Sequence, residues 1–263
     1  MTTKEAVLLY LQEHAGEPIS GEKMALALNK SRTSIWKAIQ SLKKEGYAID
    51  SSTNKGYTLS ENNDVLSEQE INQELTQQHH PIDWVIQTME TTTSTNDLAK
   101  LYANQNSTTP AIFISEEQTA GRGRLGRKFV SPAKTGLYIS LCLFPTIALE
   151  DLSLITCATA VACVETLEEL TGKSLNIKWV NDLYLNQKKI AGILTEAITS
   201  VETGLVTDVI IGVGINFSIA DFPKNLQGKA GSLFSQNSPI TRNELIAEIW
   251  KCFYETEADE LLY

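Results

Sequence analysis

The segment from residue 121 to residue 128 holds the residue types best suited to bind a phosphorylated ligand. It reads Gly-Arg-Gly-Arg-Leu-Gly-Arg-Lys, with three glycines, four cations and no acid. Glycine lets a backbone approach a ligand closely and adopt positive φ, and arginine presents forked donors that match phosphate oxygens. The pattern therefore predicts a loop that wraps a phosphorylated or adenylated ligand. A basic surface loop without a ligand is the alternative that these residues leave open.

The same letters also satisfy G-x-G-x-x-G, the dinucleotide-binding pattern. That fingerprint requires an apolar helix that opens at the glycines. Here the chain continues Lys-Phe-Val-Ser-Pro over residues 128–132, which cannot begin such a helix. The sequence also has no Walker A pattern, so the loop by itself indicates phosphate binding and nothing narrower.

The cysteines and histidines give no sign of a metal site. None of the four cysteines forms a C-x-x-C pair, and none has a histidine at metal-ligand spacing. They are Cys142, Cys157, Cys163 and Cys252. All four lie in apolar surroundings, which predicts buried free thiols. His79 and His80 are adjacent in a polar stretch before Pro81, which is typical of a solvated loop.

Charge is divided unevenly along the chain. The formal net charge is −10, but residues 1–60 carry eight Lys or Arg against six Asp or Glu, so the remaining residues carry −12. An acidic surface repels DNA, which leaves the N-terminal block as the part suited to nucleic acid. No stretch approaches the roughly 18 apolar residues of a membrane helix, and the N-terminus lacks a signal-peptide pattern. We therefore expect a cytoplasmic protein with no membrane partner.

Three short helices are predicted in the N-terminal block. Apolar spacing favours a first helix over residues 3–14. A second helix is expected from Gly21 to Leu28, with Ser20 as its N-cap. A third helix, capped by Ser31 or Thr33, runs through Ile35, Trp36, Ile39 and Leu42 to Gly46, where a C-cap glycine belongs.

A hairpin follows these helices and completes a winged helix-turn-helix. Residues 47–50 and 57–59 alternate in polarity around Asn54-Lys55-Gly56, which is turn chemistry. Recognition helices place their N-terminal residues against base edges, and wing tips contact phosphates. The candidate DNA contacts are Ser31, Arg32, Thr33, Ser34, Lys37 and Lys55. A three-helix module for protein contacts is the alternative, and a single domain with few cations needs dimerisation to bind DNA usefully.

The chain divides into a winged helix-turn-helix at 1–62, a linker at 63–82 and a larger domain at 83–263. Val65, Leu66, Ile71 and Leu75 predict a short helix inside the linker. Strands and helices interleave in the larger domain, which indicates an α+β layer. Strands are expected at 84–89, 111–115, 136–144, 177–179, 183–185, 189–197 and 207–217, and helices at 96–103, 152–170 and 243–262.

Four motifs of the larger domain resemble, in order, those of biotin protein ligases. Residues 121–127 resemble the G-R-G-R-x-G-R biotinoyl-adenylate loop of that family, and Thr93-Ser94-Thr95-Asn96 resembles its S-T-N element at the biotin pocket. Residues 178–183 resemble K-W-P-N-D, followed by Lys-Ile-Ala-Gly-Ile-Leu at 189–194. Residues 212–216 resemble a G-x-G-I-N strand end. Together with the winged helix, the resemblance covers essentially the whole chain.

The resemblance implies a class II synthetase-like catalytic domain that performs two half-reactions. Biotin and ATP, with Mg²⁺, give biotinoyl-5′-AMP and pyrophosphate, and the acyl group then passes to a lysine of a biotin carboxyl carrier protein. Adenylation activates the carboxylate without an enzyme nucleophile, so the lack of a G-x-S-x-G or Cys–His signature is consistent. The resemblance also implies a biotin-responsive repressor, in which bound biotinoyl-AMP promotes a homodimer that grips a two-fold operator DNA.

Residue roles follow from the resemblance and from charge. The biotin carboxylate and the ATP triphosphate repel each other, so arginines must neutralise them, and Lys189 can stabilise charge in the transition state. The candidates are catalytic Lys189, Arg124 and Asp182; biotin-binding Ser94, Thr95, Asn96, Gln118, Arg122, Gly123, Arg124 and Lys189; and adenylate-binding Arg122, Arg124, Arg127, Asn181 and Asn216. The simpler alternatives are helix capping for Ser94 and Thr95, a turn for Asp182 and a surface lysine for Lys189.

The sequence departs from the family pattern at three positions and at its end. Val180 stands in place of the usual proline, and Leu125 and Phe129 stand in place of a common Arg and Trp. Family members usually continue into a small C-terminal β-barrel-like domain that helps complete the nucleotide site; this chain ends at Tyr263, so we expect that domain to be absent. This motivates an alternative function, a biotin-sensing repressor with lost or partial ligase activity. Lipoate or octanoate ligation is a third interpretation, which the G-R-G-R loop followed by K-W-x-N-D disfavours.

Overall fold

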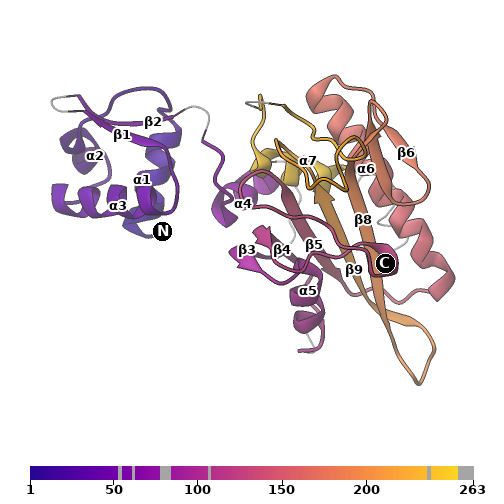
Figure 1. Cartoon of the computed structure of the whole chain (residues 1–263). Coiled ribbons are helices and arrows are strands. Elements are labelled where there is room, and N and C mark those ends of the chain that lie inside the picture. Colours follow the sequence, from indigo (N-terminus) through magenta and orange to yellow (C-terminus); the bar gives the residue numbers. More distant parts are fainter. Residues whose placement is uncertain (53–54, 61–62, 78–83, 106–107, 236–237, 254–263) are drawn as a thin grey trace. The chain divides into compact units, whose positions relative to one another are not determined.

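The chain forms two compact units, Met1–Val65 and Leu66–Tyr263. The computed structural model describes residues 1–52, 55–60, 63–77, 84–105, 108–235 and 238–253 (Figure 1). Each unit has its own hydrophobic core. The observed division lies close to the domain end predicted at residue 62, which itself falls outside the described residues.

The smaller unit is a helix-turn-helix followed by a hairpin. Helices α1 (Thr3–Gln12), α2 (Gly21–Ala27) and α3 (Arg32–Lys44) precede the antiparallel strands β1 (Ile49–Ser52) and β2 (Gly56–Leu59). This order confirms the predicted winged helix.

Capping residues fix the ends of these helices. The Ser20 and Ser31 hydroxyls accept hydrogen bonds from the backbone N–H groups of Lys23 and Ser34, both at 3.1 Å. Ser31 is therefore the N-cap of α3, which decides between the two residues that the sequence left open. Gly46 follows α3 with φ of +102°, as a helix-ending glycine should.

The wing is tied to the helices by a close backbone contact at Gly56. Its φ is +100°, and a Cβ at this position would lie 2.1 Å from the carbonyl oxygen of Ile19. Ile19 and Tyr57 exchange two backbone hydrogen bonds of 2.8 Å, so the chain before α2 pairs with β2. Of the predicted turn, residues 53–54 lie outside the described residues.

The larger unit is built on a seven-stranded mixed sheet with the order β3-β4-β5-β9-β8-β7-β6. Strands β3 and β4 are parallel, and every other neighbouring pair is antiparallel. The strands are β3 (Val85–Thr92), β4 (Ala111–Gln118), β5 (Leu137–Leu143), β6 (Asn176–Lys178), β7 (Asp182–Leu185), β8 (Lys188–Thr199) and β9 (Val206–Ile215). Each corresponds to a predicted strand, so the α+β expectation is confirmed.

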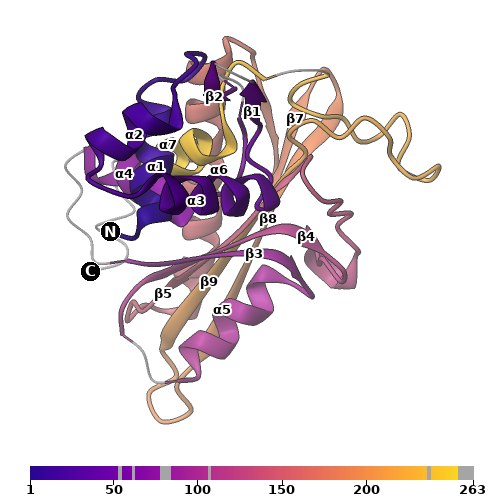
Figure 2. The same ribbon diagram turned by 90° about the vertical axis from the view of Figure 1, so that its left-hand side faces the viewer.

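Helices cover both faces of this sheet. They are α4 (Glu68–Gln77), α5 (Thr95–Ala103), α6 (Leu152–Thr171) and α7 (Arg242–Phe253). Helix α5 packs on one face against Phe113, Cys142 and Ile210, whereas α4, α6 and α7 share the core on the opposite face. Figure 2 shows α5 on the other side of the sheet from α6 and α7. None of the helices in the described ranges combines the length and apolar character that crossing a bilayer demands.

The short helix predicted in the linker forms, but it belongs to the larger unit. Ile71 and Leu75 of α4 are buried in the same core as α7, and the N–H of Ser67 donates to Oδ1 of Asn243 at 3.1 Å. Much of the segment predicted as linker is therefore packed structure, because its apolar residues find a partner helix far along the chain. The continuation of α7 to residue 262, and His79 and His80, lie outside the described residues.

Candidate functional site

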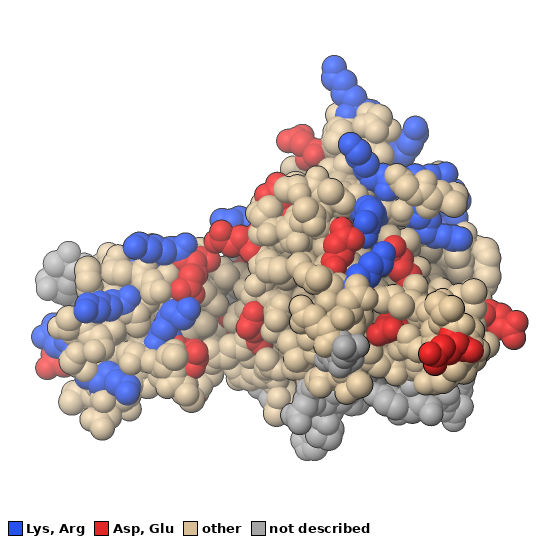
Figure 3. All heavy atoms as spheres, turned by 90° about the horizontal axis from the view of Figure 1, so that it is seen from below, with Lys and Arg blue, Asp and Glu red and all other residues tan. Residues whose placement is uncertain are grey.

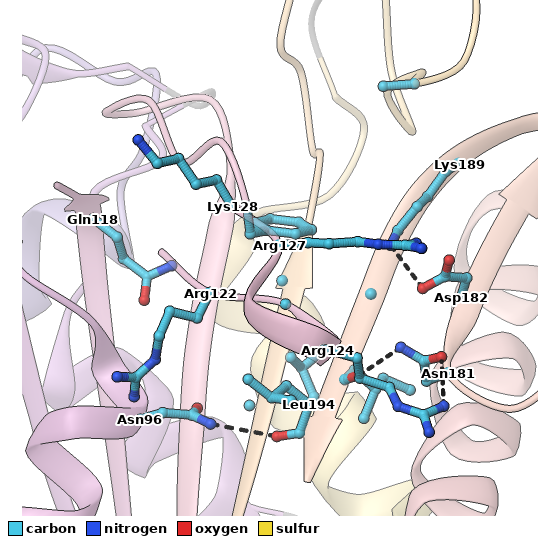
Figure 4. A pocket seen from close by; sticks show the side chains of 18 of the residues that line it. Asn96, Gln118, Arg122, Arg124, Arg127, Lys128, Asn181, Asp182, Lys189 and Leu194 are labelled. Carbon is cyan, nitrogen blue, oxygen red and sulfur yellow. Dashed lines mark hydrogen bonds and ion pairs between the residues drawn. The ribbon is translucent and has the colours of Figure 1, made fainter. Parts of the chain in front are cut away.

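A cavity of about 500 Å³ opens on the α5 face of the sheet, beyond the N-terminus of that helix. Ile210 of β9 packs beneath α5, and Gly212 and Gly214 follow on the same face because side chains alternate along a strand. The remaining walls come from the end of β4, the loop at 122–129, strands β6 to β8, and residues 226–230. Figure 4 shows side chains from these segments pointing toward one space.

Three glycines form the floor of the cavity, and the side chains of Asn96 and Phe129 lie directly against two of them. Gly192 pairs with Gly214 across β8 and β9. A Cβ on Gly212 would lie 2.2 Å from Oδ1 of Asn96, and a Cβ on Gly214 would lie 2.6 Å from the ring of Phe129. Such distances are far below van der Waals contact, so a larger residue at either position would displace the cavity wall.

A hydrogen-bonded cluster of neutral polar groups forms one end of the cavity. Oε1 of Gln118 accepts from the backbone N–H of Thr95 at 2.9 Å and from its hydroxyl at 3.2 Å. The Ser140 hydroxyl lies 2.5 Å from Oδ1 of Asn96 and 2.7 Å from Oγ1 of Thr95. Ser94 is the N-cap of α5, yet the described structure shows no capping hydrogen bond from its hydroxyl. These groups are suited to hold a neutral polar head group or a carboxylate.

Arg122 lies beside this cluster and is held by two acids. Its Nη2 forms an ion pair with Asp97 and lies 3.8 Å from Oε2 of Glu196. Glu196 also accepts from Lys100 at 2.6 Å and from Asn96 at 2.8 Å. Burial by itself would raise the pKa of Glu196, but the hydrogen bonds from Lys100 and Asn96 outweigh it and lower that pKa below its ordinary value. The network fixes the cation at the edge of the cavity.

The loop at residues 122–129, named the arginine loop below, folds back on itself. The N–H of Gly123 donates to the carbonyl oxygen of Arg127 at 2.7 Å, and the N–H of Phe129 donates to that of Gly121 at 2.9 Å. Leu125 forms the tip with φ of +57° and is 91% exposed. Arg124 lies 3.4 Å from Oδ1 of Asn181, as Figure 4 shows. The loop thereby brings Arg122, Arg124, Arg127 and Lys128 to one rim.

Lys189 and Asp182 form an ion pair of 2.6 Å on the opposite wall (Figure 4). They are placed there by the turn between β7 and β8, in which Asn186 and Gln187 have φ of +49° and +64°. Asn181 donates from Nδ2 to the carbonyl oxygen of Ile193 at 3.0 Å, which anchors the chain before β7. This turn points Lys189 into the cavity.

Asn216, predicted as an adenylate contact, is buried behind the cavity wall. Its Nδ2 lies 2.9 Å from the carbonyl oxygen of Gly231 and 3.4 Å from that of Lys189. Its backbone N–H donates to Ile190 at 2.7 Å, and its carbonyl oxygen accepts from Leu233 at 2.8 Å. In this structure Asn216 therefore joins the strand that carries Lys189 to the segment that carries the lining residues Lys229 and Ala230.

The cavity gathers the other predicted ligase residues and adds some that the sequence analysis missed. The additions include Phe129, Lys178, Tyr184 and Lys229 as lining residues, with Ser140 and Glu196 as their supports. Ser140 was detectable as the single serine within the largely apolar run Leu-Tyr-Ile-Ser-Leu-Cys-Leu of β5. No local sequence pattern pointed to Glu196, because its partners on α5 lie about a hundred residues earlier in the chain.

Cations dominate the lining of the cavity. Arg122, Arg124, Arg127, Lys128, Lys178, Lys189 and Lys229 line it, whereas Asp182 is the sole carboxylate among the described lining residues. Figure 3 shows Lys and Arg side chains gathered on one side of the larger unit. Such a surface attracts a polyanion.

The described residues form no metal-binding site made of protein side chains alone. No group of three or more His, Cys, Asp and Glu residues within the described ranges can hold a metal ion. The single carboxylate, Asp182, is already paired with Lys189. A divalent cation at this site would therefore be held largely by phosphate oxygens of the ligand.

The predicted DNA contacts lie on the smaller unit. Arg32, Thr33 and Lys37 are exposed on α3, and Lys55 is exposed beside the start of β2. The Ser31 and Ser34 hydroxyls lie 2.8 Å apart at the start of the helix. Basic side chains are visible on this unit in Figure 3.

The cysteines of the larger unit are free thiols, as predicted. Cys142 and Cys163 are buried, and burial raises the pKa of each to about 12. Cys157 and Cys252 are only partly buried, which corrects the expectation for those two.

Comparison with known proteins gives two family matches. The model described as the biotin/lipoate A/B protein ligase family matches residues 88–216, and a helix-turn-helix domain model matches residues 3–58. The bifunctional ligase/repressor BirA of Bacillus subtilis is 36% identical over 269 residues, which cover 100% of this chain and 80% of the relative. The protein of the same name from Salmonella typhimurium is 33% identical over 240 residues, or 89% of this chain and 71% of the relative.

Solved structures show the same likeness. The biotin protein ligase from Aquifex aeolicus in complex with biotin and ATP aligns with a TM-score of 0.56 and 29% identity. The alignment covers 66% of this chain and 71% of that chain.

Proposed function

The chain belongs to the bifunctional biotin ligase/repressors of the biotin/lipoate A/B protein ligase family, and on that premise we propose how its residues divide the work. It is an ATP-dependent ligase that forms biotinoyl-5′-AMP and transfers biotin to a lysine of a biotin carboxyl carrier protein, and it is a biotin-responsive repressor. One observation supports the ligase assignment: a single cavity joins a neutral polar end to a cationic rim.

The neutral end of the cavity suits biotin. Its bicyclic head fuses a polar ureido ring to an apolar sulfur-containing ring, and we place that head between Phe129 and the polar end formed by Thr95 and Asn96. Thr95, Asn96, Gln118 and Ser94 then offer hydrogen bonds to the polar groups. The biotin carboxylate would extend toward Arg122 and Lys189.

The cationic rim suits ATP. The carboxylate and the triphosphate repel each other, and Arg122, Arg124 and Arg127 reduce that repulsion from one side. Mg²⁺ would be bound mainly by the phosphate oxygens of ATP, because the described lining residues include only one carboxylate. Holding two reactants in reactive geometry can itself supply about 7–11 kcal/mol of the barrier reduction.

Lys189 is placed to stabilise the charge that develops during adenylation. A carboxylate oxygen of biotin attacks the α-phosphorus of ATP, the new acyl–phosphate bond forms, and pyrophosphate leaves. The ammonium group of Lys189 is paired with Asp182, so it is oriented and charged where the carboxylate meets the α-phosphate. In the second half-reaction the carrier lysine amine attacks the acyl carbon, AMP leaves, and an amide forms.

Biotin-dependent pyrophosphate release tests this assignment. We expect Lys189→Ala to lower the rate about 100-fold or more, because a charge-stabilising donor is lost from the transition state. The neighbouring exposed Lys188 lies outside the described lining of the cavity, so Lys188→Ala is the matched control and should retain the wild-type rate. Equal rates for the two variants would remove Lys189 from the catalytic set.

Operator binding requires two winged helices, and we propose that bound biotinoyl-AMP promotes the homodimer that provides them. The arginine loop is the element whose contacts an adenylate would change. We propose a cytoplasmic location, because operator DNA and the carrier protein are the partners that the two proposed activities need. Sedimentation velocity with and without biotin and ATP should show a shift toward dimer when both are present, and identical profiles would contradict this coupling.

A further inference from the structure

Trp36 lies on the outer face of α3, where a large apolar side chain meets water. The side chain is 53% exposed. The inner face of the helix is filled by Ile35, Ile39 and Leu42, which are fully buried. Trp36 was grouped with those residues by sequence, so its exposure is a departure from simple amphipathic packing. Exposing so much apolar surface has an energetic cost that a partner can recover.

The neighbours of Trp36 on that face are polar or cationic. Helical spacing puts Arg32, Thr33 and Gln40 three or four residues away, on the same side, and Lys37 is adjacent. Arg32, Thr33 and Lys37 are exposed as well. The aromatic ring is therefore set among donors in the first two turns of the helix.

The charge around Trp36 points to a polyanionic partner. The sequence of α3, Arg-Thr-Ser-Ile-Trp-Lys-Ala-Ile-Gln-Ser-Leu-Lys-Lys, contains no acidic residue. Lys30 precedes it, and Lys43 and Lys44 lie in its last turn. A protein partner would have to face this concentration of cations, whereas the major groove of DNA is flanked by phosphates on both sides.

We propose that Trp36 reads thymine by packing its ring against a C5-methyl group in the major groove. The major-groove edges of the bases carry donors and acceptors, and the thymine methyl is the apolar group among them. Trp36 lies one helical turn beyond Arg32, within reach of the base edges that the start of a recognition helix contacts. The inference rests on the proposed DNA binding and adds a base preference to it.

The test begins with the DNA that the protein itself selects. The full chain, with biotin and ATP present, enriches duplexes from a random-sequence library. Thymines of the selected duplex are then replaced one at a time by deoxyuridine, which removes only the C5-methyl group. Affinities are measured by fluorescence anisotropy for the wild type and for Trp36→Ala, Trp36→Phe and Leu26→Ala. Leu26 is 78% exposed on α2, so Leu26→Ala is a control for loss of exposed apolar surface in the same unit.

The expected result is specific to one thymine in each half-site. Removing that methyl should weaken binding by the wild type and by Leu26→Ala about fourfold per half-site. Trp36→Ala should bind the thymine and uracil duplexes equally, and Trp36→Phe should retain part of the preference. The salt dependence of binding should be unchanged in Trp36→Ala, because the ring contacts no phosphate, but shallower in Lys55→Ala, because the wing cation does.

Each contrary outcome has a separate meaning. If Trp36→Ala keeps the full wild-type preference for thymine, the inference is overturned while DNA binding stands. If Trp36→Ala leaves operator affinity intact and alters self-association instead, the ring belongs to a protein interface and the inference is also overturned. If no duplex is enriched by the wild type, the proposed DNA binding itself fails.

Discussion

Gly212 and Gly214 are single residues that determine what the cavity can hold. Both lie on the α5 face of β9, and an added Cβ at either would collide with Asn96 or Phe129. Neither has the positive φ that would otherwise explain a glycine. Their conformation is that of any strand residue, so the lack of a side chain serves the space above them.

Gly214→Ala tests the role of this space in biotin binding. The new methyl would lie 2.6 Å from the Phe129 ring, which lines the cavity and must move. We expect biotin to bind about tenfold more weakly, since overpacking of this kind costs about 1–3 kcal/mol. Isothermal titration calorimetry would measure it.

A matched glycine separates this effect from general destabilisation. Gly204, in the turn between β8 and β9, has φ of +73° and open space where a Cβ would lie. Gly204→Ala should lose some stability through backbone strain but keep its biotin affinity. If Gly214→Ala binds biotin as the wild type does, the glycine floor is not the biotin site.

Asn216, a predicted adenylate contact, also has a structural role. Its type and its place at a strand end indicated a ligand contact. In the structure its amide and its backbone also hold Lys189 and the 231–233 segment.

At the scale of elements, α5 is held to the sheet beneath it by polar contacts as well as apolar ones. Asn96 and Lys100 on the helix both donate to Glu196 on β8, and Arg122 of the arginine loop lies close to the same carboxylate. One acid thus connects a helix, a strand and a loop. The arrangement couples the position of Arg122 to the packing of α5.

This network predicts a pH dependence of stability. The pKa of Glu196 in the folded chain lies below its ordinary value of 4.5, so its contribution is present above that value and is lost as pH falls through the lower folded pKa. Between about pH 6 and about pH 3, the free energy of unfolding should fall more for the wild type than for Glu196→Gln. Urea unfolding followed by circular dichroism would measure it.

The control is an acid outside the network. Glu202 is exposed in the β8–β9 turn, and Glu202→Gln should retain the acid sensitivity of the wild type. Parallel curves for the wild type and Glu196→Gln would show that the carboxylate does not stabilise the fold.

Elements with local signals were predictable from the sequence. The turn at Asn186 and Gln187, the glycine that ends α6 and the caps of α2 and α3 all depend on neighbours within a few residues. Features that depend on distant partners were not. Helix α4 was expected in a linker because its partner, α7, lies some 170 residues later, and Trp36 was grouped with core residues because its periodicity does not reveal an outer binding face.

At the scale of the whole molecule, the two units differ in net charge in the way that their two functions require. The winged-helix block carries a small positive net charge, whereas the rest of the chain is strongly acidic. Within that acidic part the cations are concentrated around one cavity. A polyanionic nucleotide and DNA are therefore drawn to separate basic surfaces, while the remaining surface repels nucleic acid.

The central claim is that this one cavity activates biotin and delivers it to a protein lysine. The most direct measurement is the transfer of labelled biotin to a purified biotin carboxyl carrier domain with ATP and Mg²⁺. We expect ATP-dependent labelling that disappears when the acceptor lysine is changed to arginine. Absence of labelling by this chain, when the Bacillus subtilis relative labels the same carrier, would contradict the account.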